Sequence, residues 1–527
     1  MKRMIISFIM TAALVLSASV APAYAAETGS RFASLKKVKA KQSSLKKRST
    51  AESDLPESYS SRELGYCSSV KSQVGDVCWA FSSISSFETL LLKNNLYTAD
   101  LNTNALDTWG SKREENRGWL REIRESGSTY IPIGNFTSWS GPVVDEDDTP
   151  KYGITELSYL FKGENDAIKR AIMKTGAVTG NLMSYSRAYS KDKNSYCLTD
   201  EININTGHSI SVVGWDDNYG KENFDGNYAP KNDGAWLCKN SWGPEYNTNG
   251  GYIWVSYEDY YLFSFDTFDP SFSLDKLRVI QESDHIYQNE IYGATYELGY
   301  FGDDVTTYFN VFDFSSDGNV IEQVVFETLA FGADYTVYSV PLDKNDKPVN
   351  DRTKWNKLGE GTVDHYGFIS CDTGDKILRR GKLAIAVELD TSNTECDNSL
   401  GVSEWLREAE SKRMIFMDPV EAGKSFVTYN GEIVDVKDYY QDVLEDEIGG
   451  TLVIKAITNN TTEAEFLGDV DLNGVVDVRD ATALQKYLAD IIELNEEALL
   501  NADMNQNRSI NITDATAIRK YIAKSDE

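Results

Sequence analysis

The sequence predicts a multidomain protein in which an α+β domain is followed by an all-β sandwich and a small all-α domain. A chain of 527 residues is too long for one hydrophobic core. Apolar residues recur at helical spacing after Trp79 and at strand spacing within residues 209–255. Residues 269–458 contain short alternating runs between Gly, Asp and Asn turns, which is typical of a sandwich. Near the C-terminus, Asp480-Ala-Thr-Ala-Leu-Gln-Lys-Tyr-Leu-Ala returns as Asp514-Ala-Thr-Ala-Ile-Arg-Lys-Tyr-Ile-Ala, which indicates a repeated helical unit.

The N-terminus has the composition of a secretory signal peptide. A basic start at Met1-Lys2-Arg3 precedes an apolar run, and Ala23-Tyr24-Ala25 supplies the small residues that signal peptidase reads. A membrane anchor is the alternative, but no basic stop-transfer flank follows the apolar run. We expect residues 1–25 to be removed on secretion. Residues 26–54 are rich in Lys and Ser, contain too few apolar residues for a core, and are predicted to be a leader or short pro-segment.

Charge and cysteine content limit the classes of function. The formal net charge of −30 argues against nucleic acid or an anionic membrane as a partner, and it suits an extracellular protein. No later run is apolar for the roughly 20 residues that a membrane span needs. The chain has 6 cysteines, too few for a disulfide scaffold at this length, although Cys371 and Cys396 are a candidate pair.

A candidate nucleophile lies at the start of the predicted helix. Cys78 precedes Trp79-Ala80-Phe81, and the partial positive charge of a helix N-terminus favours a thiolate. An ordinary buried cysteine is the alternative on this feature alone. The chain has 3 histidines, of which His208 opens a predicted strand, while Asn240 follows another. An Asn carbonyl group can accept the ring N–H of a histidine and fix its orientation for Cys–His chemistry.

Three sequence blocks together resemble the papain family of cysteine proteases. They are Cys78-Trp79-Ala80-Phe81, a histidine before a strand that ends in Val213-Gly214-Trp215, and Lys239-Asn240-Ser241-Trp242-Gly243, in the family's order. Each block alone is weak, but the three in order are specific. The resemblance covers residues 55–268.

This resemblance implies a two-lobed protease with Cys78 as nucleophile, His208 as acid/base and Asn240 as the residue that orients the imidazole. It further implies that Trp242 shields the Asn240–His208 hydrogen bond and that Gln73 contributes to the oxyanion hole. The substrate would be a protein or peptide, and no cofactor is expected for catalysis.

The sequence departs from the family pattern at three positions. Gln73 lies five residues before Cys78, whereas the family usually has its glutamine six residues before the nucleophile. Gly75 stands where the family often has a disulfide-bonded cysteine, and Gly207 where many members have Asn or Asp. Because loss of an oxyanion donor costs about 10²–10³-fold in rate, the first departure matters most. Either the loop reaches the same place with one residue fewer, or Gln73 is not the donor.

The C-terminal repeat carries oxygen ligands at the spacing of a calcium-binding loop. Hard Ca²⁺ prefers six to eight oxygen ligands, and glycine at position 6 of the loop permits its sharp turn. A polar turn is the alternative for one such loop, but two copies that each precede a helix favour calcium. The predicted ligands are Asp469, Asp471, Asn473, Val475, Asp477 and Asp480 in the first loop and Asp503, Asn505, Asn507, Ser509, Asn511 and Asp514 in the second.

The two loops with their helices resemble a type I dockerin, predicted for residues 467–527 after a polar linker at 459–466. That resemblance implies two bound Ca²⁺ ions and, as partner, a cohesin module of a scaffolding protein, as in cellulose-degrading complexes. It places the chain outside the cell, at the cell surface or on a cellulosome-like scaffold. The predicted cohesin-facing residues are Val478, Arg479, Gln485 and Lys486 in the first copy and Ile512, Thr513, Arg519 and Lys520 in the second.

The middle domain, residues 269–458, contains no catalytic constellation. By pattern and position it resembles the lectin-like β-domain that follows many bacterial papain-like proteases, and a structural or exosite role is an equal alternative to carbohydrate binding. His285 and His365 are interpreted as surface or satisfied histidines rather than ligands. Two functions stay open: a secreted cysteine endopeptidase tethered by its dockerin, or a tethered sugar- or protein-binding module whose protease domain has lost activity. The intact Cys, His and Asn set favours the endopeptidase.

Overall fold

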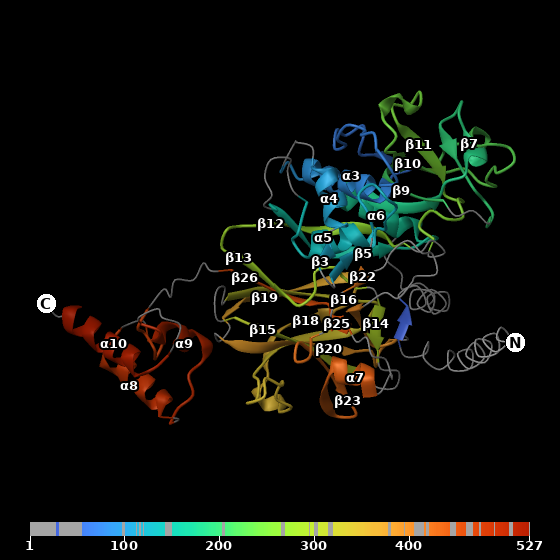
Figure 1. The fold of residues 1–527 in the computed structure, drawn as a ribbon. Coiled ribbons are helices and arrows are strands. Elements are labelled where there is room, and N and C mark those ends of the chain that lie inside the picture. The colour runs from blue at the N-terminus through green and yellow to red at the C-terminus, as the bar shows by residue number, and fades with distance from the viewer. Residues whose placement is uncertain are drawn as a thin grey trace, which may run out of the picture.

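The computed structural model describes residues 28–30 and 55–525, with internal gaps of which the longest lie at 143–149, 405–415, 443–449 and 460–466. The predicted signal peptide, most of the leader and most of the linker therefore lie outside the described residues. Figure 1 shows the helices and strands of the first domain at the top, β-sheets below them and a group of helices at the C-terminus. This arrangement confirms the predicted fold class. Within the described ranges, no helix is both long and apolar enough to cross a membrane.

The first lobe is built around helix α3 (Cys78–Lys93), which begins where the sequence predicts. Trp79, Ile84, Phe87 and Leu91 of this helix are almost fully buried, and so are its polar residues Ser83, Ser86 and Glu88. The helix is therefore covered on more than its apolar side. Two shorter helices and a small hairpin with one added strand complete the lobe: α4 (Thr103–Trp109), α5 (Tyr130–Thr137), β3 (Arg113–Glu114), β4 (Arg117–Trp119) and β22 (Phe416–Met417). A further helix, α6 (Asn165–Thr175), buries Ile168 and Ile172 in the core of the second lobe.

The second lobe is a mainly antiparallel sheet. The strands predicted at residues 209–213, 236–238 and 252–255 are confirmed as β9 (Gly207–Asp216), β10 (Ala235–Lys239) and β11 (Tyr252–Ser256). They pair in the order β9–β10–β11, and alternate side chains enter a common core. The other strands are β2 (Ser58–Ser60), β5 (Tyr152–Leu160), β6 (Val178–Met183), β7 (Tyr189–Ser190), β8 (Ser195–Tyr196) and β12 (Ser271–Val279).

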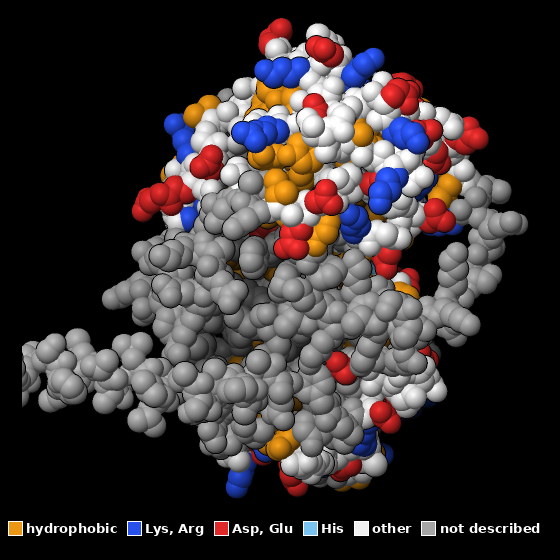
Figure 2. Space-filling view, turned by 90° about the vertical axis from the view of Figure 1, so that its right-hand side faces the viewer, with side chains coloured by type: hydrophobic (Ala, Val, Ile, Leu, Met, Phe, Trp, Pro, Cys, Tyr) orange, Lys and Arg blue, Asp and Glu red, His pale blue; other side chains and the backbone are white. Residues whose placement is uncertain are grey.

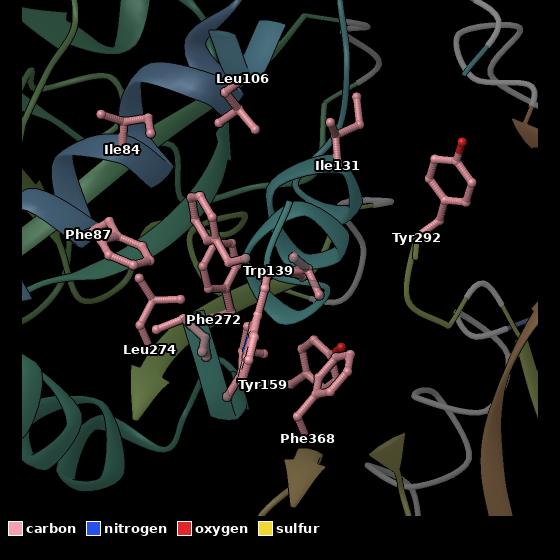
Figure 3. Close-up of a cluster of buried hydrophobic side chains, with 14 of the residues drawn as sticks. Ile84, Phe87, Leu106, Ile131, Trp139, Tyr159, Phe272, Leu274, Tyr292 and Phe368 are labelled. Carbon is pink, nitrogen blue, oxygen red and sulfur yellow. The ribbon is translucent and has the colours of Figure 1, made fainter. Parts of the chain in front are cut away.

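The first and middle domains share one sheet and one core. Strand β12 pairs with β5 and β6, and β19 (Gly367–Ile377) of the middle domain also pairs with β5. Figure 3 shows side chains of both domains in one buried cluster, including Phe87 and Tyr159 from the first and Phe368 from the second. Because burial of apolar surface is the main favourable term in folding, each domain stabilises the other.

The middle domain is a β-sandwich, with inner faces that pack Tyr308 and Val387 against Val324 and Ala456. The remaining strands of its first layer are β13 (Asp284–Gln288), β16 (Val320–Thr328) and β26 (Ile454–Asn459). Its other layer contains β15 (Val305–Asp313), β17 (Asp334–Val340), β18 (Asn356–Thr362), β20 (Lys382–Asp390), β23 (Ser425–Tyr429) and β24 (Glu432–Asp435), followed by α7 (Val436–Asp442). A smaller sheet consists of β14 (Tyr296–Gly299), β21 (Ser399–Glu404), β25 (Gly450–Leu452) and the leader strand β1 (Thr28–Ser30).

The predicted pairing of Cys371 with Cys396 is wrong. None of the chain's cysteines, all of which are among the described residues, forms a disulfide bond. Cys371 is buried within β19 in the sandwich core, whereas Cys396 lies in the turn before β21. The sandwich is therefore held by packing and hydrogen bonds rather than by this bridge.

The C-terminal domain is a small helical unit. It contains α8 (Val478–Leu488), α9 (Glu496–Ala502) and α10 (Ile512–Ser525). The two copies of the sequence repeat supply α8 and α10, and their apolar residues Leu484 and Ile518 occupy one core. Asp477 caps α8, since it accepts the Arg479 N–H at 2.7 Å.

Candidate active site

The candidate nucleophile lies at the beginning of a helix. Cys78 is the first residue of α3, and no side chain caps this end. The backbone N–H of Ser209 donates to the Cys78 sulfur at 3.4 Å. Burial raises the pKa of the Cys78 thiol to about 11, an effect that the N–H groups of Ser209 and Trp79 oppose. The sulfur thus accepts backbone N–H groups that can stabilise a thiolate, while burial, with smaller contributions from the charges of Asp269 and Asp76, favours the protonated thiol.

His208 and Asn240 are hydrogen-bonded to each other. Nε2 of His208 lies 2.9 Å from Oδ1 of Asn240, which also accepts the Ser241 N–H at 2.8 Å. Because Oδ1 is an acceptor, Nε2 carries the proton, and Nδ1 is left as the basic atom of the neutral ring. Burial lowers the pKa of His208 to about 4, and the hydrogen bond to Asn240 opposes this shift. The Trp242 ring lies over the imidazole, with centroids 4.7 Å apart.

Two neighbouring strands and one helix bring these residues together. His208 is the second residue of β9, and Asn240 directly follows β10, its antiparallel neighbour. Ser209, next to His208, supplies the contact with Cys78. Among the described contacts no hydrogen bond joins the Cys78 sulfur to the imidazole, and both pKa shifts favour a neutral thiol and a neutral ring. The resemblance to the papain family further implies that Cys78 and His208 form a thiolate–imidazolium pair, and this stays a prediction.

Gln73 lies beside this site with its amide group engaged. Nε2 of Gln73 donates to the Gly75 carbonyl at 2.8 Å, and Oε1 accepts the Ser241 hydroxyl at 2.5 Å. The Gln73 backbone N–H donates to the Ser241 carbonyl at 2.7 Å, which aligns this segment with the one after Asn240. An amide group has two N–H donors, so one donor of Gln73 is left for an oxyanion. The role predicted for Gln73 stays a prediction.

Carboxylates gather in the first C-terminal repeat. Asp469, Asp471 and Asp480 place one oxygen each within 4.8 Å of the others. Asp480 is fixed, because its oxygens accept the N–H groups of Val470, Asp471 and Asp477 at 2.7, 2.9 and 2.7 Å. Carboxylate oxygens are the ligands that Ca²⁺ prefers, so the donor set fits this ion.

The second repeat reproduces part of this arrangement. Oδ2 of Asp514 accepts the Asn511 N–H at 2.9 Å, as Oδ2 of Asp480 accepts that of Asp477. Asp503 and Asp514 are both buried. Four predicted ligands lie outside the described residues: Val475, Asn505, Asn507 and Ser509.

Comparison with known proteins assigns three parts of the chain to families. The model of the papain family of cysteine proteases matches residues 55–262. Residues 55–262 belong to the papain family. A lectin-like domain model matches residues 286–458, and a type I dockerin model matches residues 467–523. The chain therefore combines a domain of the papain family of cysteine proteases with a lectin-like domain and a C-terminal type I dockerin domain.

Similar proteins include human and bacterial members. Cathepsin L2 of Homo sapiens is 28% identical over 209 residues, which span 37% of this chain and 60% of cathepsin L2. The structure of the clostridial cysteine protease Cwp84 after propeptide cleavage is 28% identical, with a TM-score of 0.66 over 77% of this chain and 99% of that chain. The cysteine protease and lectin-like domains of Cwp84, a surface layer associated protein of Clostridium difficile, are 26% identical, with a TM-score of 0.69 over 82% of this chain and 98% of that chain.

A buried polar network behind Asn240 in the protease domain was not found from the sequence. The helical periodicity assigns Glu88 to the polar face of α3, yet its side chain is 3% exposed and lies 2.5 Å from Nζ of Lys71. The Ser68 hydroxyl donates to Glu88 at 2.5 Å and accepts from Lys239 at 2.8 Å. Lys71, Glu88, Lys239 and Asn240 line a small cavity. The signal available in the sequence is an acidic residue that directly follows Phe87 and lies two residues before the apolar run Leu90-Leu91-Leu92.

The predicted cohesin-facing residues of the dockerin domain lie at its surface. Val478 and Ile512, which occupy equivalent positions in the two repeats, are each 59% exposed. Gln485 is half-buried, and the other five residues are exposed: Arg479, Lys486, Thr513, Arg519 and Lys520.

On the face of the molecule shown in Figure 2, Lys and Arg side chains are interspersed with Asp and Glu over the protease domain, so neither charge forms a continuous patch on the described part of that face.

Proposed function

We propose that this chain is a secreted cysteine endopeptidase that uses Cys78, His208 and Asn240 and is tethered to a cohesin-bearing scaffold by its dockerin domain. The observation that carries the proposal is the 2.9 Å hydrogen bond between Nε2 of His208 and Oδ1 of Asn240, beside a cysteine at a helix N-terminus. This bond fixes the ring so that Nδ1 serves as the base for a thiol nucleophile.

In the proposed acylation step, Nδ1 of His208 takes the proton of the Cys78 thiol. The sulfur then attacks the carbonyl carbon of the scissile peptide bond, and the π electron pair moves to the carbonyl oxygen. As the tetrahedral intermediate collapses, the C–N bond breaks and Nδ1 gives its proton to the leaving amine. Because burial favours the neutral forms of both side chains in the free enzyme, we expect the first proton transfer to accompany substrate binding.

In the proposed hydrolysis step, a water molecule loses a proton to Nδ1 of His208 and adds to the thioester carbon. The C–S bond breaks, the peptide acid leaves, and the proton returns to the Cys78 sulfur. Asn240 holds the ring at Nε2 throughout, and the Trp242 ring limits access of water to that bond. The backbone N–H of Cys78 and the remaining amide N–H of Gln73 are proposed donors to the oxyanion.

The dockerin domain supplies the proposed location. Asp469, Asp471 and Asp480 would hold one Ca²⁺ ion, and Asp503, Asn511 and Asp514 are described members of the second set. Bound Ca²⁺ would neutralise the gathered carboxylates and join each loop to its helix. The exposed Val478 and Ile512 support a protein-binding surface next to both sets, and a cohesin module is the proposed partner. We further propose an extracellular, scaffold-bound location.

Peptide hydrolysis tests the proposal. The full chain should cleave denatured protein, Cys78→Ala should be inactive, and a thiol-directed epoxide should label the parent chain only at Cys78. Equal hydrolysis by the parent chain and by Cys78→Ala would remove the assignment as a cysteine protease.

The second candidate function, a tethered binding module with an impaired protease domain, is favoured by the hydrogen-bonded side-chain amide of Gln73. Absence of hydrolysis and of epoxide labelling in both proteins, with calcium-dependent cohesin binding intact, would select it.

A further inference from the structure

The loop that directly precedes Cys78, which we call the nucleophile loop, contacts a second loop, residues 121–127, which we call the arginine loop. The Asp76 N–H donates to the Arg124 carbonyl oxygen at 2.9 Å. Gly75 has a φ of +92°, and a Cβ atom at this position would lie 2.6 Å from the same oxygen. The two backbones are thus in direct contact, and only glycine fits between them.

The arginine loop is itself attached to the fold by a buried ion pair. Nη2 of Arg121 lies 2.7 Å from Oδ1 of Asp107 in α4, and the two side chains are 1% and 5% exposed. Oδ2 of Asp107 accepts the Arg124 N–H at 2.9 Å. Arg124 has a φ of +70°, a left-handed conformation that a non-glycine residue keeps only when its surroundings hold it. One carboxylate therefore fixes both the arginine side chain and the residue that contacts the nucleophile loop.

The Arg121 side chain connects the loop to the residue after the nucleophile. Nη2 also donates to the Glu125 carbonyl at 2.6 Å, and Nε donates to the Ser126 carbonyl at 3.3 Å. The guanidinium carbon lies 4.9 Å from the ring centroid of Trp79, which directly follows Cys78. A planar guanidinium group can make these contacts together, whereas a lysine ammonium group offers no such fork.

We infer that Asp107 and Arg121 are positioning residues for Cys78, and that their ion pair is a noncovalent clamp on the nucleophile loop. The clamp acts through Arg124 and Asp76 and touches no reacting atom. It holds a loop that no disulfide bond tethers, since none of the cysteines, all in the described part of the chain, is disulfide-bonded. The inference rests on the proposed function in taking Cys78 as the nucleophile.

Two variants and a matched control test the clamp in the full chain. Asp107→Asn keeps the shape of the side chain but replaces one carboxylate oxygen by an N–H donor, so the contacts with Arg121 and with the Arg124 N–H cannot both persist. Arg121→Lys keeps the charge and loses the fork. The control is Lys455→Met, which removes an ion pair of similar burial in the lectin-like domain. Nζ of Lys455 lies 2.6 Å from Oε1 of Glu290, and each of the two side chains is 1% exposed.

The readouts are kcat and KM for a peptide, the alkylation rate of Cys78 across pH followed by mass spectrometry, and thermal unfolding. Asp107→Asn should lower kcat and the alkylation rate at pH 7 by about tenfold or more, with KM changed far less, because small misplacements of reacting groups are costly. The kcat and the alkylation rate of Arg121→Lys should lie between those of Asp107→Asn and those of the parent. Lys455→Met should unfold at a lower temperature but keep the parental kcat and alkylation rate.

Alkylation separates failure of the clamp from failure of the proposed function, because it requires no turnover. If folded Asp107→Asn is alkylated with the pH profile of the parent, the pair is merely structural and the inference is overturned, whether or not the chain hydrolyses peptides. Hydrogen exchange in the parent chain gives a test that depends on no variant. The Asp76 amide should exchange slowly although the residue is exposed, and rapid exchange would also overturn the clamp.

Discussion

The hydroxyl group of Tyr159 in the protease domain donates a hydrogen bond to Oε1 of Glu327 in the lectin-like domain, and both side chains are buried. The other carboxylate oxygen, Oε2, accepts the Ala294 N–H at 2.9 Å. Burial of a carboxylate is costly unless its oxygens are hydrogen-bonded. The contact therefore joins the two domains at the core that they share.

Replacing Tyr159 with Phe should destabilise the whole two-domain unit. The substitution keeps the ring and removes one donor to buried Glu327, which we expect to cost about 1–3 kcal/mol in the free energy of unfolding. Urea unfolding of the full chain measures this cost. Tyr246→Phe is the control, because that side chain is 41% exposed. Equal stability of the two variants would contradict the role assigned to Tyr159.

The protease domain should not fold stably without the lectin-like domain. A chain that ends at residue 283 keeps β12 but loses Val325, Phe368 and Val453 from the shared core. Apolar residues such as Phe87 and Tyr159 would then face water. We expect this fragment to lack a cooperative thermal transition in near-ultraviolet circular dichroism. A chain that ends at residue 459 lacks the dockerin domain and should unfold like the full chain. A sharp transition at the parental temperature in the shorter fragment would show that the domains are independent.

The parts of the fold and site that the sequence predicts are those written in local patterns. Helical and strand periodicity place Cys78 at the start of a helix, His208 at the start of one strand and Asn240 after another, and the structure confirms these positions. The pairing of these two strands was not predicted and is seen only in the structure. Pairing of β5 with β19 was not predicted, because it joins residues far apart in the chain that carry no matching signal. Arg121 lies in a loop without periodicity, so its buried partner cannot be inferred from spacing.

Burial of His208 should make stability depend on pH. Its pKa is about 4 in the folded protein, against 6.5 for an exposed histidine. Above pH 6.5 the ring is neutral in both the folded and the unfolded chain, and the contribution of His208 to the free energy of unfolding is fully present. As the pH falls towards 4, the unfolded chain binds a proton that the folded chain does not, so the free energy of unfolding falls by up to about 3 kcal/mol.

Asp259 acts in the opposite direction and has to be separated from this effect. Burial raises its pKa to about 6, so the folded chain binds a proton before the unfolded chain does, and this contribution increases as the pH falls from 6 to 3.8. The test is therefore the difference in unfolding free energy between the parent and His208→Gln, in which Asp259 is unchanged. As the pH rises from 4 to 7, the free energy of unfolding of the parent should increase by about 3 kcal/mol relative to that of His208→Gln. A difference that is constant across this range would refute the assignment.

Gln73 should matter for turnover rather than for binding. If its remaining N–H stabilises the oxyanion, Gln73→Ala should lower kcat about 100-fold with little change in KM. Ser241→Ala is the matched control, because it removes the 2.5 Å contact with Oε1 of Gln73 and leaves the N–H donor in place. Steady-state kinetics on one peptide compare the two. Similar small losses in both variants would show that another group stabilises the oxyanion.

Calcium binding should be separable from helix capping in the first dockerin repeat. Asp480 holds three backbone N–H groups, so Asp480→Ala should lower both calcium affinity and the calcium-free stability of α8. Asp471 is exposed, and Asp471→Ala should weaken calcium binding at one of two sites by about tenfold or more while leaving the calcium-free circular dichroism spectrum unchanged. Calorimetric titration of the full chain after treatment with EDTA measures both affinities. Two sites of parental affinity in Asp471→Ala would exclude this carboxylate as a ligand, and a parent chain that binds no Ca²⁺ would remove the calcium assignment for the dockerin domain altogether.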